Sequence, residues 1–218
     1  TLAIPLAFDG RWTAASWALE GAAALWVGTR QKRMLPRIFG LLLQPAAGLA
    51  FLFDARDALD VLPVLNSHFF GGVTIALAGL FCAWSLQKNE PSAEGRASPV
   101  SGLLLAWGAL WWLGTGWHEI GRFATEQDMV KALQLSYAAV SALLCLSAQR
   151  RLAWPGMAYA ANALLAVMAG FSVLWAPHAH PFAAYGYAAW PVSFLALYWV
   201  IRRVEPDVPP GLDQANHC

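Results

Sequence analysis

Seven stretches of the chain are almost continuously apolar, and short polar connections separate them. A helix of about 20 residues, rising about 1.5 Å per residue, crosses the roughly 30 Å hydrocarbon core of a bilayer and satisfies its own backbone hydrogen bonds there. The apolar residues do not alternate with polar ones, which excludes a transmembrane β-barrel. We therefore predict an all-α, polytopic transmembrane bundle of about seven helices, near residues 12–29, 35–53, 68–86, 100–117, 129–148, 153–175 and 184–201.

Basic residues are distributed unequally between the two sets of connections. One set carries Arg30, Lys32, Arg33, Arg37, Lys88, Arg96, Arg150, Arg151, Arg202 and Arg203, and the other carries only Arg11, Arg56, Arg122 and Lys131. Cytoplasmic loops hold the excess of Lys and Arg, so we expect the N-terminus outside and the C-terminus in the cytoplasm. Residues 1–203 would then form one transmembrane domain, and 204–218, which hold three prolines, a disordered cytoplasmic tail.

Composition agrees with a membrane protein. Hydrophobic residues make up 58% of the 218 residues and charged residues only 12%, about half the charged share of a soluble domain. A net charge of +1 without a separate basic stripe argues against a nucleic-acid partner. Three cysteines without a CxxC spacing predict neither a disulfide framework nor a metal site, and we expect no cofactor. The chain begins at Thr1, which suggests a processed product or a piece of a longer protein.

Three polar residues fall near the middle of predicted spans: Glu20 in the first, Gln44 in the second and Asn162 in the sixth. An ionisable group at this depth costs about 2.5–3.5 kcal/mol on insertion scales, so it should face the bundle interior. Two interpretations stay open. The cluster either binds a substrate or relays protons, or it hydrogen-bonds between helices and fixes their packing.

A second polar set lies on the predicted outer side. His68 opens the third span, and His118 and Glu119 close the fourth, while His178 and His180 lie between the sixth and seventh. Histidine and carboxylate groups are suitable metal ligands and acid–base groups. His178 and His180 are therefore candidate metal ligands, although no HExxH spacing is present. The alternative is an interfacial polar cap, because helix ends are where polar residues belong in a membrane protein.

Part of the sequence resembles a bacterial family of predicted membrane proteins, known only as domain of unknown function 2339. The segments that carry the resemblance are the one from Ile4 to Trp26, then Arg37 to Gln44, Pro63 to Asn66 and Ala189 to Phe194, in this order. The resemblance implies a protein of the bacterial inner membrane, usually much longer, with further helices on both sides. It supplies no activity, but it places Asp9, Arg11, Glu20, Gln44 and Asn66 within the recognisable motifs.

These observations lead to three hypotheses. The first is a non-enzymatic, transport-related or envelope-assembly component within a larger polytopic protein. Its midplane polar site would be Glu20 with Gln44, and its outer site His118 with Glu119. The second is an intramembrane or periplasmic-face enzyme for a lipid-linked substrate, with His68, His118 and Glu119 as acid–base groups. The third is a structural scaffold. Membrane lipids, other helices of a parent chain and other envelope proteins are the expected partners.

Overall fold

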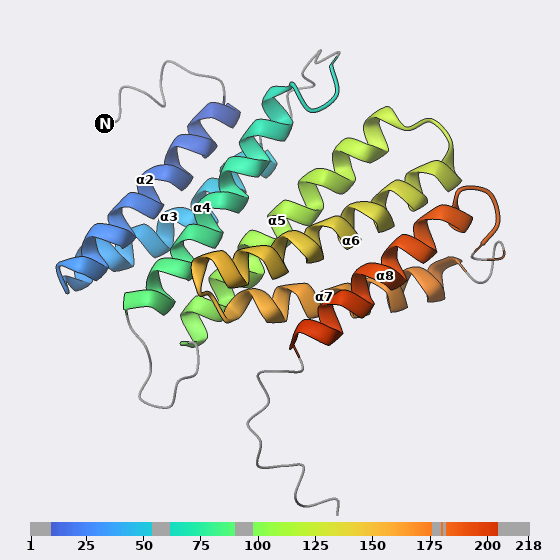
Figure 1. The fold of residues 1–218 in the computed structure, drawn as a ribbon. Coiled ribbons are helices and arrows are strands. Elements are labelled where there is room, and N and C mark those ends of the chain that lie inside the picture. Colours follow the sequence, from blue (N-terminus) through green and yellow to red (C-terminus); the bar gives the residue numbers. More distant parts are fainter. Residues whose placement is uncertain (1–9, 54–61, 90–97, 176–179, 181, 205–218) are drawn as a thin grey trace, which may run out of the picture. The chain divides into compact units, whose positions relative to one another are not determined.

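A computed structural model describes residues 10–53, 62–89, 98–175, 180 and 182–204. Within these ranges the chain forms seven α-helices and no strand, which confirms the predicted all-α class. The helices are α2 (Gly10–Arg30), α3 (Met34–Phe53), α4 (Ser67–Asn89), α5 (Pro99–Phe123), α6 (Gln127–Leu152), α7 (Gly156–Trp175) and α8 (Gly186–Val204) (Figure 1). The predicted tail lies outside the described residues, apart from its first residue at the end of α8.

The helices coincide with the predicted spans, and most extend a few residues beyond them. The start of the sixth span was placed three residues too early, because Ala153 adopts a left-handed conformation with φ 48° and ends α6. The amide of Trp154 then bonds to the carbonyl of Gln149 at 3.0 Å, which closes the end of α6 in the manner of a Schellman motif. Pro155 therefore lies in the turn before α7, whereas Pro45 lies inside α3.

Four of the described helices are long and apolar enough to cross a membrane by length and composition. They are Met34–Phe53, Ser67–Asn89, Gln127–Leu152 and, in α7, Gly156–Val173. The helices α2, α5 and α8 contain 21, 25 and 19 residues, so their length also suffices to span. They are richer in Gly, Ser, Thr, Tyr and Trp, residues of low hydropathy, and their insertion remains a prediction from the sequence.

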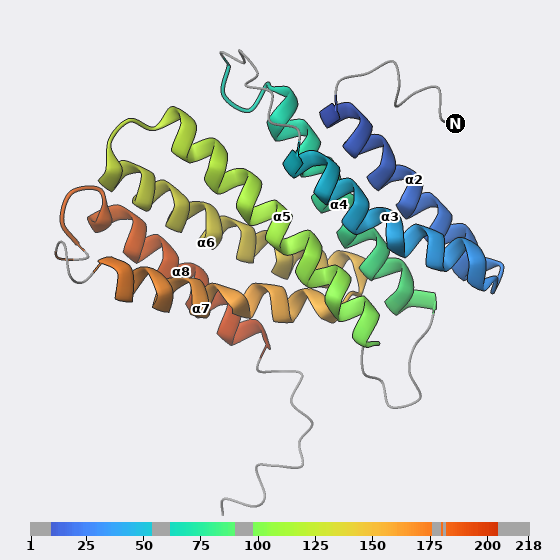
Figure 2. The same cartoon turned by 180° about the vertical axis from the view of Figure 1, so that it is seen from behind.

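The chain divides into two compact units, Thr1–Ala124 and Thr125–Cys218. In unit 1, α2 packs against α3 and α4, and α4 packs against α5 (Figures 1 and 2). In unit 2, α6 packs against both α7 and α8. The boundary follows α5. The connection between α4 and α5 falls within the range of unit 1.

Glycines allow α2 and α3 to approach closely. A Cβ atom built on Gly40 would lie 2.5 Å from the carbonyl oxygen of Gly21 and 2.6 Å from the amide nitrogen of Leu25. No larger residue fits there without moving the helices apart. In lipid, where burial of apolar surface does not drive helices together, such close packing is a main source of association.

The contact between α4 and α5 also depends on small residues. A side chain on Gly72 would collide with Thr115, and one on Gly108 would lie 2.9 Å from the carbonyl oxygen of Ala76. Near the other end of this helix pair, the hydroxyl of Ser101 donates to the carbonyl of Ala83 at 3.0 Å. The register of α5 on α4 is therefore fixed at several levels, and this fixes the site described next.

Candidate functional site

A pocket of about 490 Å³ lies in unit 1 between the end of α3, the start of α4 and one face of α5. Its lining consists of Phe51, Leu52, His68, Trp107, Leu110, Trp111, Gly114, Thr115 and His118. On α5, Trp107, Trp111 and His118 recur at helical spacing and so share one face. From Trp107 to His118 the helix rises about 16 Å, about half the hydrocarbon thickness of a bilayer.

The imidazole rings of His68 and His118 stack on each other at one end of the pocket, where α4 begins and α5 ends. Their centroids lie 4.4 Å apart, with an interplanar angle of 29°. Phe51 contacts His68 edge-on at 4.9 Å and Trp111 edge-on at 5.3 Å. The structure thus brings together two histidines separated by 50 residues of sequence, both of which the sequence analysis selected.

The indole of Trp107 forms the opposite, mid-helix end of the pocket. Two glycines hold this ring, because a Cβ on Gly48 would lie 2.6 Å from it and one on Gly79 would lie 3.0 Å from it. Trp107 also contacts Trp111 at 5.8 Å between centroids. The aromatic wall is therefore fixed in place by packing, as expected for a preformed binding site.

Glu119, the third candidate on this side, anchors the backbone before α4. Its Oε1 atom accepts hydrogen bonds from the backbone N–H of Val64 at 2.7 Å and from the side-chain amide of Asn66 at 2.5 Å. Val64 adopts φ 65°, which is unusual for a β-branched residue and requires compensating contacts. Glu119 supplies such a contact. It does not pair along its own helix with Arg122, whose guanidinium lies 5.4 Å from the ring centroid of Phe123.

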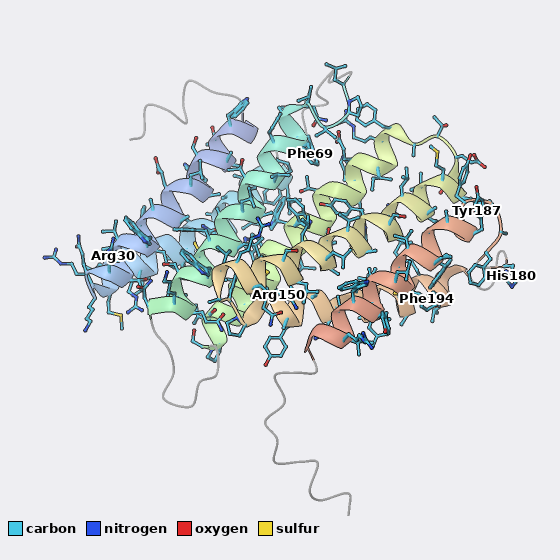
Figure 3. All side chains as sticks on the ribbon, in the orientation of Figure 1. Arg30, Phe69, Arg150, His180, Tyr187 and Phe194 are labelled. Carbon is cyan, nitrogen blue, oxygen red and sulfur yellow. The ribbon has the colours of Figure 1, made fainter. Side chains whose placement is uncertain are left out.

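The bond to Asn66 links Glu119 to the position of His68. Asn66 caps α4, since its Oδ1 accepts from the backbone N–H of Phe69 at 2.7 Å. Phe69 lies in the first turn of the helix (Figure 3). His68 belongs to the same turn. Glu119 therefore positions one histidine of the stacked pair through Asn66, and it is the sequence neighbour of the other.

The second oxygen of Glu119 has a different environment. Oε2 is buried and has no hydrogen-bond partner among the described residues, and the whole residue is only 5% exposed. A buried acceptor without a partner is costly. Glu119 itself does not line the pocket, so its established role is to hold Val64 and Asn66 through Oε1.

The described residues contain no group of three or more His, Cys, Asp and Glu side chains that could hold a metal ion. Of the predicted metal pair, His178 lies outside the described residues. His180 is exposed, and its Nδ1 accepts from the backbone N–H of Phe182 at 3.2 Å. A metal at these two positions remains a prediction.

Among the midplane residues, Gln44 is buried and its side-chain amide donates to the carbonyl of Ala18 on α2 at 3.0 Å. The same nitrogen lies 3.7 Å from the sulfur of Cys82 on α4, so one side chain connects three helices. Glu20 is half-buried on α2, two residues beyond Ala18. Asn162 is exposed on α7, in unit 2.

Four residues of the site were not predicted from the sequence: Phe51, Trp107, Trp111 and Val64. The spacing of Trp107, Trp111 and His118 on one helical face was an available signal for the two tryptophans. Nothing in the sequence links Val64 to Glu119, because their hydrogen bond follows from how α4 and α5 pack.

Comparison with known proteins establishes the family. No curated protein and no solved structure matches the chain. A family described as predicted membrane proteins, DUF2339, matches residues 1–217, which confirms the resemblance seen in the sequence motifs. Together with the apolar helices, this identifies an integral membrane protein. The chain belongs to the DUF2339 family of predicted membrane proteins.

Proposed function

We propose that the pocket between α3, α4 and α5 binds one amphiphilic, lipid-linked molecule, and that the protein is an envelope-assembly component of the bacterial inner membrane. The observation that carries the proposal is the polarity of the pocket along its length. The stacked imidazoles of His68 and His118 lie at one end and the indole of Trp107 at the other. An amphiphile has the same division into a polar head and an apolar chain.

Dimensions support this ligand class. A volume of about 490 Å³ falls within the range of about 300–1,000 Å³ that is usual for small-molecule sites. Leu52 and Leu110 line the pocket and are 68% and 69% exposed. In a membrane such side chains face hydrocarbon, so an apolar chain has a route into the pocket from the bilayer.

The proposed orientation places the histidine end of the pocket at the outer surface. Unit 1 has seven described cations, of which Arg11 and Arg122 lie at the same end as the stacked histidines. The other five lie at the opposite end, in the last turns of α2 and α4, in the turn between α2 and α3 or at the start of α3: Arg30, Lys32, Arg33, Arg37 and Lys88. The excess of cations is therefore at the end opposite to the histidines. By the positive-inside rule this end is cytoplasmic. The head group would then be bound at the outer leaflet, where envelope precursors are handled.

We give the pocket precedence over the midplane residues as the functional site. The amide of Gln44 is used in an interhelical hydrogen bond, which favours the packing interpretation for that residue. The pocket, in contrast, is lined by both imidazoles of the stacked pair, His68 and His118, and has the volume to hold a ligand.

Gly114 offers a direct test, because a Cβ on this pocket-lining residue meets nothing within 4 Å. Gly114→Phe should fill the pocket without disturbing helix packing. Gly121→Phe is the matched control: it lies on the same helix, is equally open and does not line the pocket. The full chain is extracted with its surrounding lipid, and bound amphiphiles are identified by mass spectrometry.

We expect an amphiphile enriched over the bulk membrane in the wild type and in Gly121→Phe, and at least tenfold less of it in Gly114→Phe. Equal enrichment in all three proteins, or a bound lipid population identical to the bulk membrane, would refute the proposal. Circular dichroism and gel filtration verify that both variants remain folded.

A second candidate, an acid–base enzyme for the same ligand, is favoured by the convergence of His68 and His118. Glu119 would then be a positioning residue, since its Oε1 is committed to Val64 and Asn66. The purified chain, incubated with the amphiphile that it retains, would yield a product of altered mass. His118→Gln should abolish that product while the amphiphile remains bound. Absence of any product from the wild type excludes this candidate.

A further inference from the structure

The turn between α2 and α3, at the end of unit 1 opposite to the pocket, concentrates positive charge. Arg30, Lys32 and Arg33 are exposed and form no ion pair with any described residue. Arg37 lies in the first turn of α3. Around Arg30, side chains that end in nitrogen atoms point away from the helices (Figure 3). The described residues of the turn, α3 and α4 include no acidic side chain.

The conformation of Lys32 is unexpected for this turn. Its φ is 54°, and the amides of Lys32 and Arg33 bond back to the carbonyls of Thr29 at 3.3 Å and Gly28 at 2.9 Å. This is the Schellman geometry, in which the left-handed position is usually glycine, because any side chain there is strained. A lysine is present where glycine would stabilise the fold, which points to a function for its charge.

Packing contacts restrict two further cations at this end of unit 1, Arg37 and Arg30. A Cβ on Gly28 would lie 2.7 Å from Cγ of Arg37, so the stem of Arg37 rests directly on the last turn of α2. The guanidinium of Arg30 lies 5.2 Å from the ring centroid of Trp26, a cation–π contact that restricts its position. Tryptophan rings of this kind lie at the head-group level of a bilayer.

We infer that this turn is a binding site for the phosphate of an anionic phospholipid, with Lys32, Arg33 and Arg30 as its ligands. The site does not depend on the amphiphile pocket or on the proposed function. It differs from the general positive-inside effect, which requires cations near a helix end but not in a strained left-handed position.

The experiment uses the full chain in mixed micelles of phosphatidylglycerol and phosphatidylcholine, with retained lipid measured by native mass spectrometry. Lys32→Gly tests the central residue. Gln31→Lys combined with Lys32→Gly moves the charge by one residue and leaves the net charge unchanged. Arg122→Gln, at the opposite end of unit 1, is the control.

The wild type and Arg122→Gln should retain phosphatidylglycerol in preference to phosphatidylcholine. Lys32→Gly should lower that preference about fivefold, as expected for one cation at a lipid surface, and yet unfold at a higher temperature in phosphatidylcholine alone. The charge-relocating double variant should lose the preference to the same extent. Arg33→Gln gives the same test of lipid preference without altering the left-handed position.

Three results would overturn the inference. The first is a wild type without lipid preference. The second is a double variant that keeps the full preference, which would reduce the effect to general charge. The third is displacement of phosphatidylglycerol by millimolar inorganic phosphate at constant ionic strength, which would assign the site to a free anion.

Discussion

The backbone N–H of Val64 donates a hydrogen bond of 2.7 Å to Oε1 of Glu119, 55 positions further along the chain. The strained residue before α4 is thus held by a buried carboxylate at the end of α5. Because Asn66 binds the same oxygen and caps α4, the two helix ends form one connected unit. The stacked histidines lie beside it, so the geometry of the pocket depends on this contact.

Two substitutions of Glu119 should show whether its hydrogen bonds or its charge stabilise the protein. Glu119→Ala removes the acceptor from Val64 and from the buried Asn66 amide, which should cost about 1–3 kcal/mol of unfolding free energy. Glu119→Gln keeps an oxygen at the Oε1 position and should lose less than half as much. Denaturant unfolding in detergent micelles measures both. Equal losses in the two variants would show that the charge, and not the acceptor, holds the turn.

The close contact between α4 and α5 predicts that alanine at one glycine destabilises the protein and alanine at another glycine stabilises it. Gly72→Ala drives a methyl group into Thr115 and should destabilise by about 1–3 kcal/mol. Gly102→Ala, where a Cβ meets nothing within 4 Å, should stabilise α5 by about 0.5–1 kcal/mol. Adding Thr115→Ala to Gly72→Ala should restore part of the loss, because it removes the colliding hydroxyl and methyl groups. Similar stabilities for Gly72→Ala and the wild type would contradict the packing.

The hydrogen bond from Gln44 to Ala18 predicts that two substitutions of Gln44 lower the free energy of unfolding by different amounts. Gln44→Leu should cost only about 0.6 kcal/mol, the average for interhelical hydrogen bonds in membranes, since it also removes a buried oxygen without a partner among the described residues. Gln44→Glu should cost more, because it replaces the donor with a carboxyl group. The relative stabilities of the wild type and the two variants are measured by unfolding in denaturing detergent. A larger loss in the leucine variant would mean that Gln44 has a further partner.

In unit 2, the phenol of Tyr185 donates to Glu126 at 3.1 Å. This hydrogen bond, together with the charge of Glu126, raises the pKa of Tyr185 above its ordinary value. A raised folded-state pKa means that the stabilisation is complete below the unfolded value of about 10 and is lost as the pH rises through the folded value. Glu126→Gln should therefore lower the tyrosine titration midpoint. Labelled-tyrosine NMR measures it, with Tyr185→Phe to assign the signal, and an unchanged midpoint would disprove the contact.

Sequence alone predicts the helices of this protein well because the segments that form them are long and mainly apolar, and polar connections separate them. Continuous apolar length identifies every described helix. Two spans were started too early, at Ala153 and before Gly186, where local turn geometry and not hydropathy sets the boundary. The fourth span was ended too early, at residue 117, because α5 continues through polar residues to Phe123. The two compact units could not be predicted, because their boundary after Ala124 has no distinctive composition.

The candidate site is predictable only in part. His68, His118 and Glu119 are conspicuous in the sequence because polar residues are rare in such a chain. Their arrangement depends on Gly72, Gly79 and Gly108, which set how closely α4 and α5 pack, and no local pattern specifies that register.

The most direct test of the account is a structure of the full chain in a lipid nanodisc, with a bound antibody fragment to aid particle alignment. We predict elongated density between α3, α4 and α5, with its polar end at His68 and His118 and its apolar end at Trp107. A pocket closed by its own side chains, or histidines too far apart to share one head group, would contradict the central claim.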